Sequence, residues 1–223
     1  MSEAWIARAV LLGVILMTVL VRPTLLPRWS WSSLRQGLLF GAPELAIAAG
    51  LLAVAVHSGI DVQLTALARL VPFVVREELI FRFLLLACLV KLIGVRRGVV
   101  LSSIAFAAIH LAPSGPDIGW VIPDHAWTKV WSSLAGGLLY GVIYVRTRNP
   151  FPPLILHWAI DAPFFVAADG NRLWSVIEHP GFAAIWGLEA AYALWLLRVA
   201  TLDPESSGSP AVSDPEPVPS NVR

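Results

Sequence analysis

Long apolar stretches recur along this chain, and they constrain its fold more than any other feature. A helix needs about 20 apolar residues to cross the hydrocarbon core of a bilayer. Candidate stretches, of which the third is short, lie at residues 4–21, 37–57, 98–112, 128–146, 152–168 and 182–199. The segment 64–94 is also mostly apolar, but it exceeds one bilayer thickness. The pattern predicts an all-α fold: a polytopic transmembrane helical bundle of seven spans, or eight if 64–94 is divided.

Composition supports a location in the membrane. Of the 223 residues, 57% are hydrophobic and 14% are charged. Soluble domains are about 45–50% apolar and about 25% charged, so one soluble core could not bury this much apolar surface. We therefore expect a multi-pass integral membrane protein, surrounded by membrane lipid, in the cytoplasmic membrane of a prokaryote. No basic patch interleaved with aromatic residues is present, so nucleic acid is not an expected partner.

The chain divides into one large domain and a tail. Residues 1–202 are predicted to form a transmembrane catalytic domain whose motif-bearing core is about 64–168. The polar residues 203–223 are rich in Pro, Ser and acidic side chains, and they are predicted to be a disordered tail. A kinked long helix or two shorter pieces would fit the long segment 64–94, and Pro72 is the natural place for the kink or break.

Basic and acidic residues alternate between successive predicted loops. Under the positive-inside rule, seven spans place the N-terminus outside and the C-terminus in the cytoplasm. His110 lies near the end of its apolar stretch, whereas Arg96 and Arg97 lie just before the start of that stretch. We therefore expect His110 to lie toward the non-cytoplasmic side.

Ionisable side chains within the apolar stretches are the candidate functional residues, because charge inside a bilayer is costly and is retained mainly for function. Each could also have a purely structural role, as a buried ion pair, a core histidine or a polar contact between helices. These side chains form three groups: Glu77, Glu78 and Arg82; His110; and His157 and Asp161.

Spacing predicts how these groups are oriented. Glu78 and Arg82 are four residues apart, so they share a helix face and can pair. Glu77 is offset from Glu78 by about 100° and can point into a different environment. His157 and Asp161 are also four apart, so the carboxylate can orient the imidazole.

Together the groups have the composition of a hydrolytic site. A glutamate and a histidine can activate a water molecule, and hydrogen-bond donors can stabilise the oxyanion that forms when water attacks an amide. The residues therefore favour peptide-bond hydrolysis within the membrane.

The order of the motifs resembles a known family. The chain carries EExxxR from Glu77, then FxxxH ending at His110, then HxxxD from His157. Over about residues 70–168 this pattern is similar to the CAAX protease and bacteriocin-processing (CPBP) family, also called Abi, which includes the Ras-converting CAAX endopeptidase. The resemblance implies an all-helical, glutamate-type intramembrane endopeptidase.

The resemblance also implies a role for each matching residue. Glu77 and His110 would activate the water, while Glu78 and Arg82 would hold and tune that site. The substrate would be a protein or peptide, which can be lipidated or membrane-anchored: a CAAX-like C-terminus, a peptide precursor or a C-terminal sorting segment.

The final motif position departs from the family pattern. The resemblance implies that His157 and residue 161 stabilise the oxyanion, but the family most often has Asn where this chain has Asp161. An ionised Asp cannot donate a hydrogen bond. Either Asp161 is protonated in its apolar setting, or it orients His157.

No cofactor is expected. Zinc is the alternative, since Glu77, His110 and His157 could supply ligands, but the chain contains no HExxH motif. Two other functions remain open. One is a proton-coupled transporter that uses the same buried residues as a relay, although no inverted repeat is visible. The other is a non-catalytic immunity or scaffold protein on the same fold.

Two further features have packing interpretations. Glu44 lies in the stretch 37–57; it could be a further site residue, but it is expected instead to face a cavity or the interface beside Pro43. Gly137 and Gly141 form a GxxxG pattern, which predicts close approach of a neighbouring helix.

Overall fold

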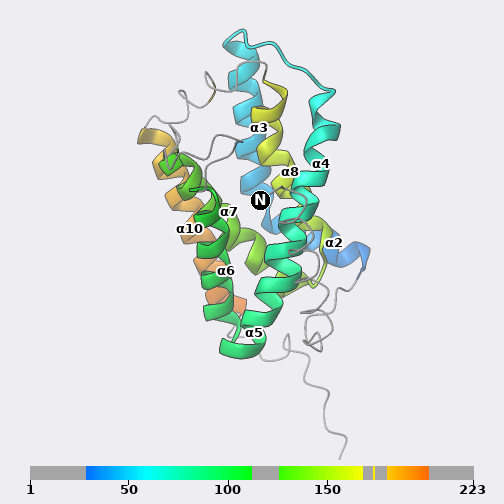
Figure 1. Ribbon diagram of the computed structural model, residues 1–223, viewed down its shortest axis with the longest axis vertical. Helices are drawn as coiled ribbons and strands as arrows, with labels where there is room; N and C mark the ends of the chain where they lie inside the picture. Colours follow the sequence, from blue (N-terminus) through cyan, green and yellow to red (C-terminus); the bar gives the residue numbers. More distant parts are fainter. Residues whose placement is uncertain (1–28, 112–125, 168–172, 174–179, 201–223) are drawn as a thin grey trace, which may run out of the picture.

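The computed structural model describes residues 29–111, 126–167, 173 and 180–200 (Figure 1). The predicted first span at 4–21 and the predicted tail at 203–223 lie outside these residues. Apart from an isolated bridge between Val62 and Ala167, the regular structure of the described residues is helical, which confirms the all-α prediction for them. The helices are α2 Trp31–Phe40, α3 Ala42–His57, α4 Ala66–Glu78, η1 Leu79–Leu86, α5 Ala87–Ile93, α6 Val95–Ile109, α7 Ala126–Thr147, α8 Phe151–Val166 and α10 Pro180–Ala200.

Of the two alternatives for the segment 64–94, one long helical run is found, and a division into two pieces at Pro72 is not. Pro72 lies inside α4, and the helix continues through it to Glu78. Pro72 is exposed, whereas Leu70 and Val74 are buried against the rest of the bundle. Packing on either side of the proline thus outweighs the loss of one backbone hydrogen bond. The irregularity comes later, where α4 passes directly into the π-helix η1.

Helix α7 is the central element of the bundle. It packs along α6 on one side and α10 on another, and it also touches α8, α2 and η1 (Figure 1). Its second half joins a dense core that includes Leu86, Val99, Ile143 and Tyr144. We call this core and the helix segments around it the packed half.

The GxxxG prediction is confirmed. A Cβ atom on Gly141 would lie 3.2 Å from Val99 of α6, and one on Gly137 would lie 3.2 Å from Ser103 of α6. Both glycines therefore let α6 and α7 approach closely, which aligns the residues that α6 and α7 contribute to the candidate site.

Helices α2 and α3 meet at a bend of 61°. Gly41 lies at this bend, and a side chain at that position would overlap Leu156 of α8. Pro43, in the first turn of α3, suits the start of a helix because its missing N–H is not needed there. The bend lays α3 alongside α8.

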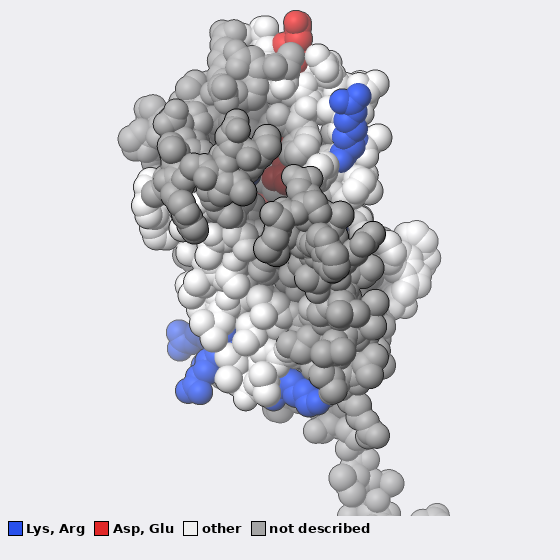
Figure 2. Space-filling model, viewed as in Figure 1, with Lys and Arg blue, Asp and Glu red and all other residues white. Residues whose placement is uncertain are grey.

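Charge is distributed unevenly along the bundle. Figure 2 shows most of the visible lysine and arginine side chains at the lower end of the molecule, where α5 meets α6 in Figure 1, one more near the upper end, and an acidic group at the top. The turn between α5 and α6 carries Lys91, Arg96 and Arg97, and the last turn of α10 carries Arg198.

Apolar side chains are exposed on several helices. Leu101 and Ile104 of α6 and Leu188 and Trp195 of α10 are at least 46% exposed. Among the described helices, α10 is long and apolar enough to cross a membrane. The bent pair α2–α3 adds a second span if it is counted as one, and α8 is apolar but shorter. The expected seven or eight spans stay a prediction.

Candidate active site

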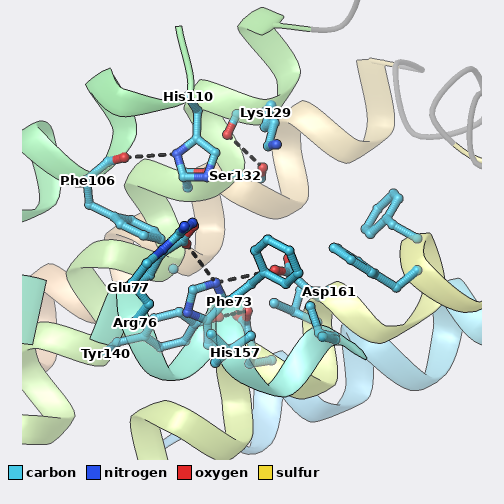
Figure 3. A pocket seen from close by; sticks show the side chains of 18 of the residues that line it. Phe73, Arg76, Glu77, Phe106, His110, Lys129, Ser132, Tyr140, His157 and Asp161 are labelled. Carbon is cyan, nitrogen blue, oxygen red and sulfur yellow. Dashed lines mark hydrogen bonds and ion pairs between the residues drawn. The ribbon is translucent and has the colours of Figure 1, made fainter. Parts of the chain in front are cut away.

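His157 of α8 lies among carboxylates where α8 packs on α4 (Figure 3). Its Nδ1 is 2.9 Å from Oε1 of Glu78. Its Nε2 is 3.4 Å from Oδ2 of Asp161 and 3.7 Å from Oε2 of Glu77. The ring itself is buried. One imidazole thus gathers carboxylates from two helices.

The backbone of α4 and α8 explains this convergence. His157 and Asp161 are one turn apart on α8, so their predicted contact is confirmed. Trp158, the residue after His157, donates its Nε1–H to the carbonyl oxygen of Leu67 at 3.3 Å. That bond fixes α8 against the first turn of α4, and α4 carries both glutamates at its other end.

The adjacent glutamates have different surroundings. The side chain of Glu78 is 2% exposed, and that of Glu77 is 20% exposed. This confirms that the two carboxylates point into different environments. Arg76 lies 3.7 Å from Glu77 at the exposed side. Glu77 can therefore meet a molecule in the cavity, whereas Glu78 is enclosed by protein.

The predicted Glu78–Arg82 pair is confirmed. Nε of Arg82 is 3.4 Å from Oε2 of Glu78, and both side chains are buried. The guanidinium also lies over the rings of Phe106, at 4.5 Å, and Tyr140, at 5.4 Å. Aromatic faces attract a cation, so these rings help to offset the cost of burying Arg82.

Arg82 belongs to the π-helix η1, which the sequence did not reveal. π-helical turns use i→i+5 hydrogen bonds and are frequent at functional sites. Ser102 of α6 donates its hydroxyl to the carbonyl oxygen of Phe81 at 3.0 Å. This bond from α6 satisfies a backbone acceptor within η1 and holds the segment that carries Arg82.

His110 lies at the end of α6 and points into the same cavity as Glu77 (Figure 3). Its Nδ1 is 2.9 Å from the carbonyl oxygen of Phe106. A carbonyl only accepts, so Nδ1 carries a proton and Nε2 of the neutral ring is free to accept one. The Phe106 ring packs edge-on against both His110 and His157.

The cavity has a volume of about 620 Å³. The predicted residues Glu77, His110, His157 and Asp161 line it, while Glu78 and Arg82 support His157 from behind. The remaining wall is rich in aromatic side chains and also contains Glu44, Arg76, and a lysine and two serines of α7; Glu44 thus faces a cavity, as expected. This arrangement places a carboxylate and two imidazoles around a space that can hold a peptide segment.

Sequence reasoning missed several residues at this site. Tyr140 of α7 stacks on His157, and Glu189 and Trp186 of α10 are buried nearby, with Trp186 also lining the cavity. A signal for Glu189 was available, because it is an ionisable residue inside the apolar stretch 182–199. Tyr140 gave no such signal, since a tyrosine in an apolar helix is usually a packing residue.

Zinc is the cofactor that the sequence left open as an alternative. Among the described residues, no group of three or more His, Cys, Asp or Glu side chains is placed to hold a metal ion.

A known family matches part of the chain. The family described as "Type II CAAX prenyl endopeptidase Rce1-like" matches residues 59–163. The chain carries an Rce1-like domain. This domain runs from the end of α3 into the last turns of α8, and every predicted site residue lies within it. No curated protein and no solved structure matches the chain.

Proposed function

We propose that this protein is a CAAX-type intramembrane endopeptidase in which Glu77 and His110 activate a water molecule. The observation that carries this proposal is the cavity that Glu77, His110 and His157 line within the Rce1-like domain. Glu77 is the glutamate of the adjacent pair whose side chain reaches the cavity, so it is the group that can take a proton from water.

The first chemical step forms a tetrahedral intermediate. The water oxygen attacks the carbonyl carbon of the scissile amide, and its proton passes to the Glu77 carboxylate, with Nε2 of His110 as a second acceptor beside it. The oxyanion that forms accepts a hydrogen bond from the Nε2–H of His157. Glu78 accepts from Nδ1–H at the other side of the ring and fixes its orientation.

The second step breaks the amide bond. The proton held by Glu77 or His110 moves to the leaving nitrogen, the C–N bond breaks, and the products are a carboxylic acid and an amine. The transferred proton and the electron pair of the broken C–N bond both end on the leaving nitrogen, so the step needs no further reactant. Arg82 stays outside the reaction and neutralises Glu78.

Asp161 acts as an orienting group in this mechanism. Its carboxylate lies 3.4 Å from Nε2 of His157. An ionised carboxylate accepts and cannot donate, so it does not stabilise an oxyanion itself. It holds the ring until the substrate carbonyl occupies the cavity.

We place the protein in the membrane as a multi-pass bundle, with the cavity opening on the non-cytoplasmic side. The exposed apolar side chains of α6 and α10 support contact with lipid. The basic end at the α5–α6 turn fits the cytoplasmic face, and His110 lies at the other end of α6. A membrane-impermeant maleimide should therefore label Asp61→Cys in intact cells. The wild type, whose Cys88 is buried, is the blank. Labelling only after lysis would reverse the orientation.

The activity test uses the purified full chain in liposomes. The probe is an internally quenched peptide with a farnesylated C-terminal CAAX sequence, compared with the same peptide without the lipid. Wild type should cleave it, and Glu77→Gln should lower kcat by about 10²- to 10⁴-fold, since Gln keeps the size but cannot take the proton. Asp61→Asn, which removes an exposed carboxylate elsewhere, is the matched control.

Full cleavage by Glu77→Gln would refute the glutamate mechanism. Equal cleavage of the two peptides would show that the lipid is not recognised. The natural substrate can then be sought by comparing C-terminal protein fragments in cells that carry wild type or Glu77→Gln.

A further inference from the structure

Tyr140 connects the candidate active site to a second polar cluster. Its ring stacks on the His157 imidazole, with 5.6 Å between ring centroids and 24° between planes. At its other end, the hydroxyl donates to Oε1 of Glu44 at 2.6 Å. Tyr140 is therefore held by α3 and holds a side chain of α8, although it belongs to α7.

The backbone of α7 leaves room for this ring position. Gly136 is one turn before Tyr140, and a Cβ atom there would lie 3.2 Å from both Cζ and the hydroxyl oxygen of the tyrosine. The Arg82 guanidinium lies 5.4 Å from the centre of the same ring. The ring thus fits between a glycine on its own helix, the His157 imidazole and a buried cation.

Burial of the Glu44 carboxyl inside the bundle costs free energy. The residue is 1% exposed, and the described residues offer its Oε2 no donor other than a protonated carboxyl. Glu189 of α10 is buried close enough for such a side-chain hydrogen bond with Glu44. Buried carboxylates in a membrane protein are costly and are retained mainly for function.

The hydrogen bond between Tyr140 and Glu44 is short, as strong hydrogen bonds are. A length of 2.6 Å is typical of a hydroxyl that donates to an ionised carboxylate. Glu44 lies outside residues 59–163, so it reaches the Rce1-like domain from a flanking helix. The two residues are also 96 apart in the sequence, and no local pattern links them.

We propose that Glu44 and Tyr140 are positioning residues for His157. The Glu44 carboxylate fixes the hydroxyl end of Tyr140, and the ring then fixes the plane of the imidazole so that Nε2 faces the cavity. Glu78 fixes the same imidazole through Nδ1, so the ring is held both in its plane and from its face. This inference rests on the proposed role of His157 as donor to the oxyanion.

The proposed role of Tyr140 and Glu44 predicts which kinetic constant their variants change. Because His157 contacts the oxyanion only as it forms, Tyr140→Phe should lower kcat and leave KM unchanged. We expect a drop of about 10- to 100-fold, the range produced by small misplacement of catalytic groups. Glu44→Leu should reproduce the loss. Glu44→Gln keeps an oxygen that can accept the tyrosine hydroxyl and should restore most of the rate.

The assay uses the full chain in liposomes with the farnesylated CAAX peptide. Tyr192→Phe is the matched control, since its hydroxyl donates to the carbonyl oxygen of Phe40 at 3.2 Å, away from His157. The double variant Tyr140→Phe/Glu44→Leu should be no slower than either single variant, because both changes remove the same Tyr140–Glu44 hydrogen bond. Tyr140→Phe keeps the ring and the packing, so it tests this hydrogen bond even if Glu44→Leu does not fold.

Three outcomes would overturn the inference. These are a wild-type kcat in Tyr140→Phe, a rise in KM at constant kcat, or additive losses in the double variant. Failure of the proposed function is recognised separately, since wild type and Glu77→Gln would then treat the peptide alike.

Discussion

The two halves of the bundle are built differently. In the packed half, glycines bring helix backbones together, and Leu139, Ile143 and Tyr144 of α7 are fully enclosed. In the other half, which we call the cavity half, the first part of α7 faces a space of about 620 Å³, with Gly136 and Tyr140 in its wall. One helix thus supplies both a core and a cavity wall.

This difference separates stability from chemistry. Close packing of apolar side chains contributes most of the stabilisation of a helical membrane protein. Charged residues around an open space contribute little to it and retain the freedom to meet a substrate. We therefore expect changes in the packed half to lower the free energy of unfolding, and changes in the cavity half to lower activity.

Arg82→Leu should have the largest effect on stability, because Arg82 lies where the halves meet. The change leaves Glu78 buried without its counter-charge, which costs about 3–5 kcal/mol of unfolding free energy. Unfolding in mixed micelles with increasing denaturing detergent measures this cost. The double variant Glu78→Leu/Arg82→Leu should be more stable than the single one. A loss below about 1 kcal/mol in Arg82→Leu would match an exposed pair instead.

Gly98→Ala should have an intermediate effect, confined to the packed half. Its Cβ atom would lie 2.9 Å from the backbone nitrogen of Val90, which cannot move aside easily. Overpacking of this kind costs about 1–3 kcal/mol. The kcat of the folded protein should not change. Gly50→Ala is the control, since no atom of the described residues outside its own helix turns lies within 4 Å of the added Cβ, and it should stabilise α3 slightly. Equal destabilisation by both variants would contradict the comparison.

Asp161→Asn should have the smallest effect, confined to the cavity half. The side chain is 39% exposed, so its charge contributes little to stability. Asn still accepts from His157, and it can also donate to the oxyanion. We expect kcat to change by about fivefold or less, the scale of one neutral hydrogen bond. A loss as large as that of Glu77→Gln would show that Asp161 itself takes the proton.

The sequence predicted contacts within a single helix correctly. The His157–Asp161 pair and the different environments of Glu77 and Glu78 follow from the 3.6-residue period and are present. The predicted Glu78–Arg82 pair is present too, although Arg82 belongs to the π-helix η1. The GxxxG pattern likewise predicted the close contact of α6 and α7. Apart from the Glu78–Arg82 pair, these predictions succeeded because each depends on geometry that the α-helix itself imposes.

Sequence reasoning was incomplete where the outcome depends on neighbouring helices. Pro72 allows a kink or a break when α4 is considered alone, but burial of the residues on both sides keeps the helix continuous. The π-helix η1 is similar, since Ser102 on another helix satisfies one of its carbonyl groups.

By itself, the sequence determined an all-α chain of apolar segments and the short list of ionisable residues that such segments carry at a cost. Tertiary structure alone decided which of these residues meet across different helices. Glu78 and His157 are 79 residues apart, and Tyr140 and Glu44 are 96 apart. The helical period fixes the directions of side chains around one helix axis. These contacts depend on how separate helices are rotated and shifted relative to one another, which the packing of α3, α4, α7 and α8 sets as a whole.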